Sequence, residues 1–175
     1  MAVELGISPG TVRIHVSNIL AKLGVDYSLV RSKEDLSHLT HLIIPGGEST
    51  TMEKLLRAYD MWNILSEKLK SKKLKSFGTC AGSILLSKFG MKIEVERNGY
   101  GSQLHSFFAD LESKQFPNLK GIFIRAPKFT AHGNNVTVLA THNDEPVLLE
   151  EDNMLVASFH PELSGEMRVH EWFLK

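Results

Sequence analysis

A short segment around the only cysteine constrains the fold of this 175-residue chain more than any other feature. Positions 78–82 read Gly-Thr-Cys-Ala-Gly, with a short run bounded by two apolar residues (residues 74–77) before them and a helix-like run (residues 83–86) after them. This order predicts a strand, a sharp turn and a helix, the arrangement of a nucleophile elbow with cysteine in place of serine. The two glycines allow a tight turn because they carry no Cβ, and the helix N-terminus favours the thiolate of Cys80. A lone cysteine is also common as a small buried hydrophobe, so Cys80 by itself leaves both interpretations open.

The composition restricts the class of protein. The 20 basic and 20 acidic residues balance to a formal net charge of zero, which argues against nucleic-acid or membrane binding by bulk charge. A single cysteine cannot form an internal disulfide, as suits the reducing cytoplasm. No apolar run approaches the roughly 18 residues of a membrane span, and the first residues do not resemble a signal peptide. We therefore expect a soluble, cytoplasmic protein of one domain, residues 1–175, that binds neither nucleic acid nor membrane.

Helical and strand patterns alternate along the first half of the chain. A helix is expected from Thr11 to Leu23, a buried strand from Leu39 to Ile44, and a helix from Thr51 to Lys70 that a capping box at 50–53 opens. Beyond Gly90 short strands follow one another, as hairpins do: residues 92–96, 121–125, 136–140, 146–149 and 154–159, before a last helix from about Gly165. The pattern predicts an α/β fold of three layers, with a mixed, mostly parallel sheet and helices on both faces.

A histidine and a carboxylate follow the last predicted strand, which runs directly into His160, Pro161 and Glu162. Pro161 fixes the backbone, so that the side chains on either side of it can point the same way. A catalytic cysteine requires a base that a carboxylate orients: His160 would accept the thiol proton, and Glu162 would fix its tautomer and stabilise the imidazolium. A histidine at the end of a strand is also common as a structural residue.

A glycine-rich turn is the third feature, since positions 45–49 read Pro-Gly-Gly-Glu-Ser between a predicted strand and a predicted helix. Backbone N–H groups in such a turn can stabilise an oxyanion, although most Gly-Gly turns are only turns. All three features fall at the carboxyl ends of predicted strands, where open α/β sheets form their sites. Their coincidence favours a catalytic group of Cys80, His160 and Glu162.

These motifs resemble those of class I (triad) glutamine amidotransferases. Positions 45–51 read Pro-Gly-Gly-Glu-Ser-Thr-Thr, and positions 158–163 read Ser-Phe-His-Pro-Glu-Leu. Two further stretches, Val-Glu-Arg-Asn-Gly-Tyr-Gly at 95–101 and Phe-Ile-Arg-Ala-Pro at 123–127, are more narrowly similar to the glutaminase subunit of pyridoxal 5′-phosphate synthase. The resemblance extends over nearly the whole chain from about Gly10, and it implies the flavodoxin-like fold of that family.

The resemblance implies hydrolysis of L-glutamine to glutamate and ammonia through a γ-glutamyl thioester on Cys80, with no metal and no bound cofactor. The ammonia would pass to a (β/α)₈-barrel synthase subunit that builds pyridoxal phosphate. Backbone N–H groups near Gly47 and Ala81 would form the oxyanion hole, and two arginines would suit the α-carboxylate of the substrate, unless they are simply solvated. The substrate-binding residues are then Gly46, Gly47, Glu48, Ser49, Ala81, Arg97, Ile124 and Arg125. A glutaminase subunit of another pathway and a catalytically silent binding protein on the same fold are the alternatives.

The N-terminal part of the chain departs from the family and suggests another alternative. Positions 8–10 read Ser-Pro-Gly where the family has a Leu-Gln-Gly-like turn, and Ser102 replaces a usual arginine. Residues 5–25 also resemble the recognition half of a LuxR-type helix-turn-helix, but such a domain needs scaffold helices ahead of it, so we expect the first helix of the α/β fold here.

His38 and His41 have no third partner for a metal site.

Overall fold

The computed structural model describes residues 2–5, 10–100 and 106–175 of the chain. Within these ranges seven strands form one sheet in the order β2-β1-β3-β4-β11-β10-β9. The first five run parallel, whereas β10 is antiparallel to β11 and β9 is antiparallel to β10. The strands are β1 (Ala2–Leu5), β2 (Tyr27–Val30), β3 (His41–Ile44), β4 (Lys75–Thr79), β9 (Thr137–His142), β10 (Glu145–Glu151) and β11 (Met154–Ala157). The predicted mixed, mostly parallel sheet is confirmed.

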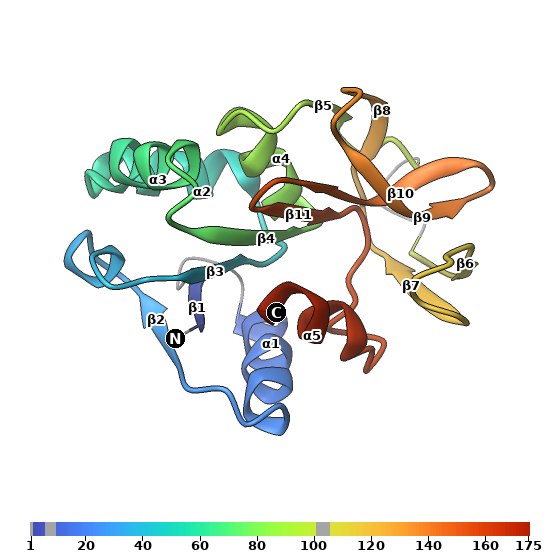
Figure 1. Ribbon diagram of the computed structural model, residues 1–175, viewed down its shortest axis with the longest axis horizontal. Coiled ribbons are helices and arrows are strands. Elements are labelled where there is room, and N and C mark those ends of the chain that lie inside the picture. The colour runs from blue at the N-terminus through green and yellow to red at the C-terminus, as the bar shows by residue number, and fades with distance from the viewer. Residues whose placement is uncertain (1, 6–9, 101–105) are drawn as a thin grey trace.

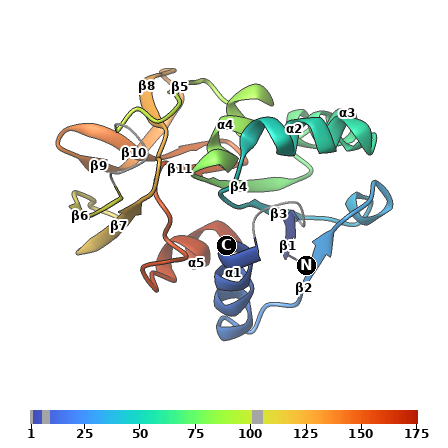
Figure 2. The same ribbon diagram turned by 180° about the vertical axis from the view of Figure 1, so that it is seen from behind.

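Helices cover both faces of this sheet, as Figures 1 and 2 show from opposite sides. One face carries α1 (Gly10–Lys22) and α5 (Arg168–Leu174). The other face carries α2 (Ser49–Ala58), α3 (Met61–Lys70) and α4 (Ala81–Lys88). Strand β3 shows why both faces need cover: Leu42 and Ile44 join the core beneath α2–α4, whereas Ile43 joins the core beneath α1 and α5.

The single helix predicted from Thr51 to Lys70 is wrong. Helix α2 ends at Ala58 and α3 begins at Met61, with Asp60 between them in the left-handed region at φ 56°. A left-handed residue cannot continue the i to i−4 hydrogen-bond ladder, and aspartate is among the few residues that tolerate this conformation. The break turns one expected helix into two that pack against each other.

Two small antiparallel sheets stand beside the main one (Figure 1). Strand β5 (Ile93–Glu96) pairs with β8 (Lys128–His132), and β6 (Phe107–Leu111) pairs with β7 (Leu119–Phe123). Strands β2, β6 and β8, and a 3₁₀ turn at Glu34–Leu36, were not expected from the sequence. Much of each of these three strands is exposed or half-exposed, so the apolar pattern that predicts buried strands is weak there.

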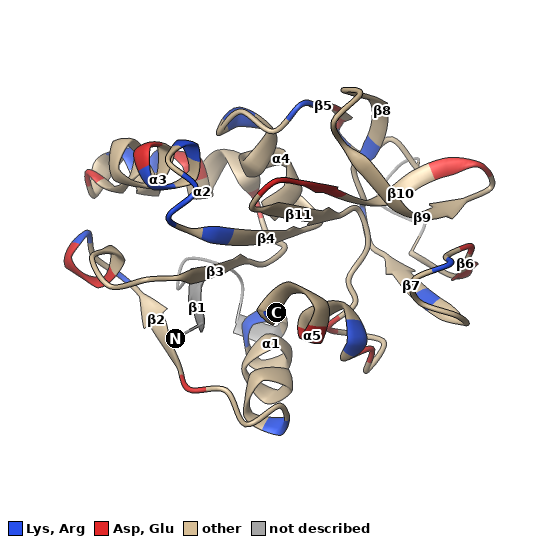
Figure 3. Cartoon of the chain, in the orientation of Figure 1, with Lys and Arg blue, Asp and Glu red and all other residues tan. Residues whose placement is uncertain are grey.

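Charged residues of both signs are mixed along the chain, most visibly on helices α2 and α3 (Figure 3). This mixing agrees with the formal net charge of zero. Among the described residues, no helix combines the length and the apolar character that crossing a bilayer requires.

Candidate active site

Three neighbouring parallel strands bring the three predicted features to one edge of the sheet. Strand β4 lies between β3 and β11, with Ile44 paired to Gly78 and Ala157 paired to Thr79. The glycine turn directly follows β3, Cys80 directly follows β4, and His160 lies three residues beyond the end of β11. Because parallel strands end at the same edge, the nucleophile, the base and the glycine turn meet there.

The elbow at Cys80 depends on close packing between β3, β4 and α4. Cys80 has φ 48° and ψ −112°, an unfavourable conformation for a residue with a Cβ and one expected of a nucleophile elbow. A Cβ on Gly78 would lie 2.6 Å from the carbonyl carbon of Gly82, and one on Gly82 would lie 1.9 Å from the carbonyl oxygen of Ile44. Neither glycine has a positive φ, so the elbow needs them for close approach.

The side chains of Cys80, His160 and Glu162 form one buried group. His160 Nδ1 and Glu162 Oε1 are 2.7 Å apart, and Thr79 Oγ1 donates to the same carboxylate oxygen at 3.2 Å. His160 and Cys80 interact closely enough for the sulfur to raise the pKa of the ring. The ring packs on the glycine turn, because a Cβ on Gly46 would lie 2.4 Å from His160 Cε1 and 3.3 Å from Cys80 Cβ. The exposed fractions of Cys80, His160 and Glu162 are only 7%, 4% and 2%.

The surroundings of His160 favour its protonated form. Burial by itself lowers the pKa of the ring, but hydrogen bonds and charge interactions with Cys80 and Glu162 outweigh it and raise the pKa of His160 to about 10. The ring is therefore an imidazolium at neutral pH. An imidazolium beside a nucleophilic sulfur can donate a proton to a leaving amine and, once neutral, can act as a base toward water.

The raised pKa of His160 predicts how stability depends on pH. A group whose pKa rises on folding stabilises the native state fully below its unfolded pKa, here near 6.5, and this contribution is lost as pH rises toward about 10. Glu162→Gln removes one cause of the raised pKa. We therefore expect the variant's deficit in free energy of unfolding, relative to the wild type, to be larger at pH 6.5 than at pH 10 in urea titrations. An equal deficit at both pH values would contradict this account.

A cavity of about 430 Å³ opens at this edge of the sheet. Cys80 and His160 line it, whereas Glu162 lies behind the histidine ring. Its lining includes all eight residues that were expected to bind substrate: Gly46, Gly47, Glu48, Ser49, Ala81, Arg97, Ile124 and Arg125. Four further lining residues were not expected from the sequence, namely Val12, Ile84, Asn98 and Pro127. Asn98 and Pro127 stand inside motifs that carry the family resemblance, whereas Val12 and Ile84 were seen only as apolar helix positions.

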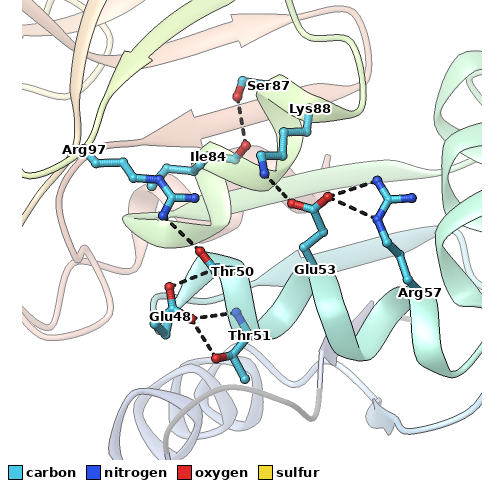
Figure 4. A network of polar contacts seen from close by, with 9 residues as sticks. All are labelled: Glu48, Thr50, Thr51, Glu53, Arg57, Ile84, Ser87, Lys88 and Arg97. Carbon is cyan, nitrogen blue, oxygen red and sulfur yellow. Dashed lines mark hydrogen bonds and ion pairs between the residues drawn. The ribbon is translucent and has the colours of Figure 1, made fainter.

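Glu48 and Arg97 hold one wall of the cavity in place (Figure 4). The Glu48 carboxylate caps α2: it accepts from the N–H groups of Thr50 at 3.0 Å and Thr51 at 2.6 Å, and from Thr51 Oγ1 at 2.7 Å. These bonds lower the pKa of Glu48 to about 2, and the bond from the Thr51 hydroxyl contributes most. Arg97 Nη1 donates to Thr50 Oγ1 at 3.0 Å and so ties the segment after β5 to the start of α2. The capping box predicted at 50–53 is wrong, because Glu53 instead pairs with side chains of α2 and α4.

The segment after β7 contacts the cysteine. The Cys80 thiol donates to the backbone carbonyl of Ile124 at a sulfur–oxygen distance of 3.7 Å. The next residue, Arg125, has φ 47°, which ends the strand at Phe123 although it was expected to reach Arg125. The turn thus brings a main-chain acceptor and a guanidinium to the same side of the cavity.

Two other expectations concern the departures from the family and the absence of a metal site. Ser8, Pro9 and Ser102, positions at which the sequence departs from the family, lie outside the described residues. Within the described ranges, no group of three or more His, Cys, Asp or Glu side chains is arranged to hold a metal ion.

Comparisons with known proteins identify the family of the chain. The SNO glutamine amidotransferase family matches residues 5–175. "Pyridoxal 5′-phosphate synthase subunit PdxT" of Thermosipho africanus (strain TCF52B) is 47% identical over 184 residues, covering 98% of this chain and 97% of that protein. The protein of the same name from Francisella tularensis subsp. novicida (strain U112) is 45% identical over 163 residues, covering 90% and 89%.

A solved structure described as a glutamine amidotransferase superimposes with a TM-score of 0.93 at 39% identity, over 99% of this chain and 96% of that one. The sequence match, the curated relatives and this structural neighbour all extend over nearly the full length of the chain. The chain belongs to the SNO glutamine amidotransferase family.

Proposed function

We propose that this chain is the glutaminase subunit of a pyridoxal 5′-phosphate synthase, which hydrolyses L-glutamine to L-glutamate and ammonia. The observation that carries the proposal is the burial of Cys80, His160 and Glu162 in one group, with Cys80 and His160 on the wall of a cavity that Arg97 and Arg125 also line. The two PdxT relatives bear the name of a subunit of that synthase and match over nearly their full length.

Cys80, His160 and Glu162 divide the reaction among them. The Cys80 thiolate attacks the side-chain amide carbon of glutamine, and backbone N–H groups near Gly47 and Ala81 stabilise the resulting oxyanion. The His160 imidazolium protonates the amide nitrogen, so that ammonia leaves and a γ-glutamyl thioester remains. The neutral ring then takes a proton from water, whose oxygen attacks the thioester and releases glutamate and the thiolate. Glu162 holds the ring by its bond to Nδ1 throughout.

The remaining cavity residues recognise the amino-acid part of the substrate. Arg97 and Arg125 offer guanidinium donors to the α-carboxylate, and the carboxylate of Glu48, which stays ionised because of its low pKa, offers an acceptor to the α-ammonium group. A cavity of about 430 Å³ is within the usual range for a small polar ligand.

Residues 1–175 act as one domain in the cytoplasm, and the ammonia passes to a synthase subunit with a (β/α)₈ barrel.

Glutamate release from the purified chain tests this proposal, measured with and without a pyridoxal phosphate synthase subunit. With the subunit, glutamine, a pentose phosphate and a triose phosphate present, we expect glutamate and pyridoxal phosphate to form together. Exogenous ammonium salt in place of this chain serves as the control for an active synthase. If the control forms pyridoxal phosphate but no glutamate ever appears, the chain is a silent binding protein. If glutamate appears only with the synthase of another pathway, the partner assignment is wrong.

A further inference from the structure

Helix α5 carries a histidine that the proposed mechanism does not use. His170 is fully buried, and neither of its ring nitrogens has a hydrogen-bond partner among the described residues. Its ring stands edge-on to the ring of Phe77, with the centroids 5.4 Å apart. Buried imidazoles nearly always satisfy at least one ring nitrogen, so this pair of nitrogens needs an explanation.

The carboxylate of Glu162 also has a buried atom without a hydrogen-bond partner. Glu162 Oε1 accepts hydrogen bonds from the His160 ring and from Thr79, but Oε2 is buried and finds no partner in the described part of the chain. A buried carboxylate oxygen without a donor costs free energy, and a donor at that oxygen would hold the carboxylate at both ends. The orientation of His160 depends on this carboxylate.

The two unsatisfied groups are neighbours on one face of the sheet. Phe77, against which His170 packs, and Thr79, which binds Glu162, are two residues apart on β4. Their side chains therefore leave the strand on the same face, about 6.6 Å apart at 3.3 Å per residue. A single water molecule can join two buried polar atoms that lie near each other, through two hydrogen bonds of roughly 2.8 Å each.

The charges around His170 agree with such a bridge. Burial lowers the pKa of His170, while the charges of Glu162 and Glu166 act in the opposite direction without reversing the shift. The ring is therefore neutral at neutral pH and has one N–H donor and one bare nitrogen. The backbone of Glu166 lies near the ring but does not meet hydrogen-bond geometry with either nitrogen. A water that donates one proton to the bare nitrogen and the other to Glu162 Oε2 would give the carboxylate oxygen its donor and His170 a partner at one of its two ring nitrogens.

We propose that His170 is a positioning residue of the active site, which holds the free oxygen of Glu162 through one bridging water and so fixes the orientation of His160. The inference rests on the proposed function in one respect, that Glu162 orients the catalytic base. It adds a fourth side chain, from the far end of the chain, to the group that sets the geometry of the triad.

Apolar and polar replacements of His170 separate this role from simple packing. His170→Leu and His170→Phe, two apolar side chains of different shape, are expected to lower kcat about tenfold or more with KM for glutamine unchanged, because misplacing a catalytic group costs rate. His170→Gln keeps an amide that can bind the water and should retain most of kcat. His41→Leu is the matched control, because His41 Nε2 is also buried without a partner in the described ranges and its ring contacts Phe173 of α5. We expect this control to keep its kcat.

Two further readouts decide the outcome. In a Glu162→Gln background, His170→Leu should lower kcat no further, since it acts through Glu162. A folded apolar variant with wild-type kcat, or a loss that adds fully to that of Glu162→Gln, would overturn the proposal. The NMR resonance of the His160 Nδ1 proton needs no activity and should move in the apolar variants but not in His41→Leu. If the wild type hydrolyses no glutamine, the proposed function fails, whereas an unmoved resonance in a folded variant counts against His170 alone.

Discussion

Cys80→Ser is expected to reduce glutamine hydrolysis by about 10⁴-fold or more, because loss of one member of a catalytic triad removes nearly all of its joint effect. The thiolate is the nucleophile of the proposed mechanism, and a serine hydroxyl is far harder to ionise. His160 would keep its bond to Glu162 but would face an oxygen that does not attack the amide. Glutamate release by the variant, measured with the synthase subunit present, gives the size of the loss.

The same variant should leave the fold and the substrate site intact. Serine matches cysteine closely in size, and the backbone N–H of residue 80 donates to the carbonyl of Ala157 at 2.8 Å whatever its side chain. We therefore expect an unchanged thermal midpoint and an unchanged affinity for glutamine by calorimetry. Wild-type protein quenched during turnover should carry the mass of a γ-glutamyl group, and Cys80→Ser should not. Glutaminase activity within tenfold of the wild type would remove Cys80 from the mechanism.

The parts of the fold that sequence predicts well are those that local chemistry determines. The elbow, the buried strands and the mostly parallel sheet follow from glycine spacing and from apolar runs between turns. The break at Asp60 was missed because one left-handed residue leaves no mark in an apolar pattern that continues on both sides. Glu48 was not expected to cap α2, because the Thr50–Glu53 pattern offered an equally good local alternative.

In the candidate site, too, the sequence predicts what local chemistry determines and misses what depends on packing. The residues at the ends of β3, β4 and β11 could be gathered into one site, because parallel strands that neighbour one another end together. Val12 could not be assigned to the cavity wall, since its position depends on how α1 packs on the sheet. No role was predicted for His170 either, whereas His38 and His41 were considered as metal ligands because they are three residues apart. Burial behind the triad is a tertiary property, so only the structure reveals it.

Gly82→Ala is expected to lower the free energy of unfolding by about 3 kcal/mol or more, although alanine normally stabilises a helix by about 1 kcal/mol relative to glycine. The new Cβ would lie 1.9 Å from the carbonyl oxygen of Ile44 and 2.9 Å from its carbonyl carbon. Both atoms belong to the backbone of β3, which pairs with β4 and cannot retreat without breaking that pairing. Helix α4 must therefore shift away from the sheet, and Cys80 shifts with it.

Urea unfolding of the wild type, Gly82→Ala and Gly24→Ala measures this effect against a matched control. Gly24 has φ 67° but no atom within 4 Å of its would-be Cβ, so alanine there should cost only the conformational strain of about 1–2 kcal/mol. For a chain of this size each kcal/mol corresponds to roughly 2–4 °C in thermal midpoint, so Gly82→Ala should unfold about 6–12 °C lower. A variant as stable as the wild type would show that α4 can move away from β3 at no cost. In that case the close contact beneath the elbow would not be what holds Cys80 in its strained conformation.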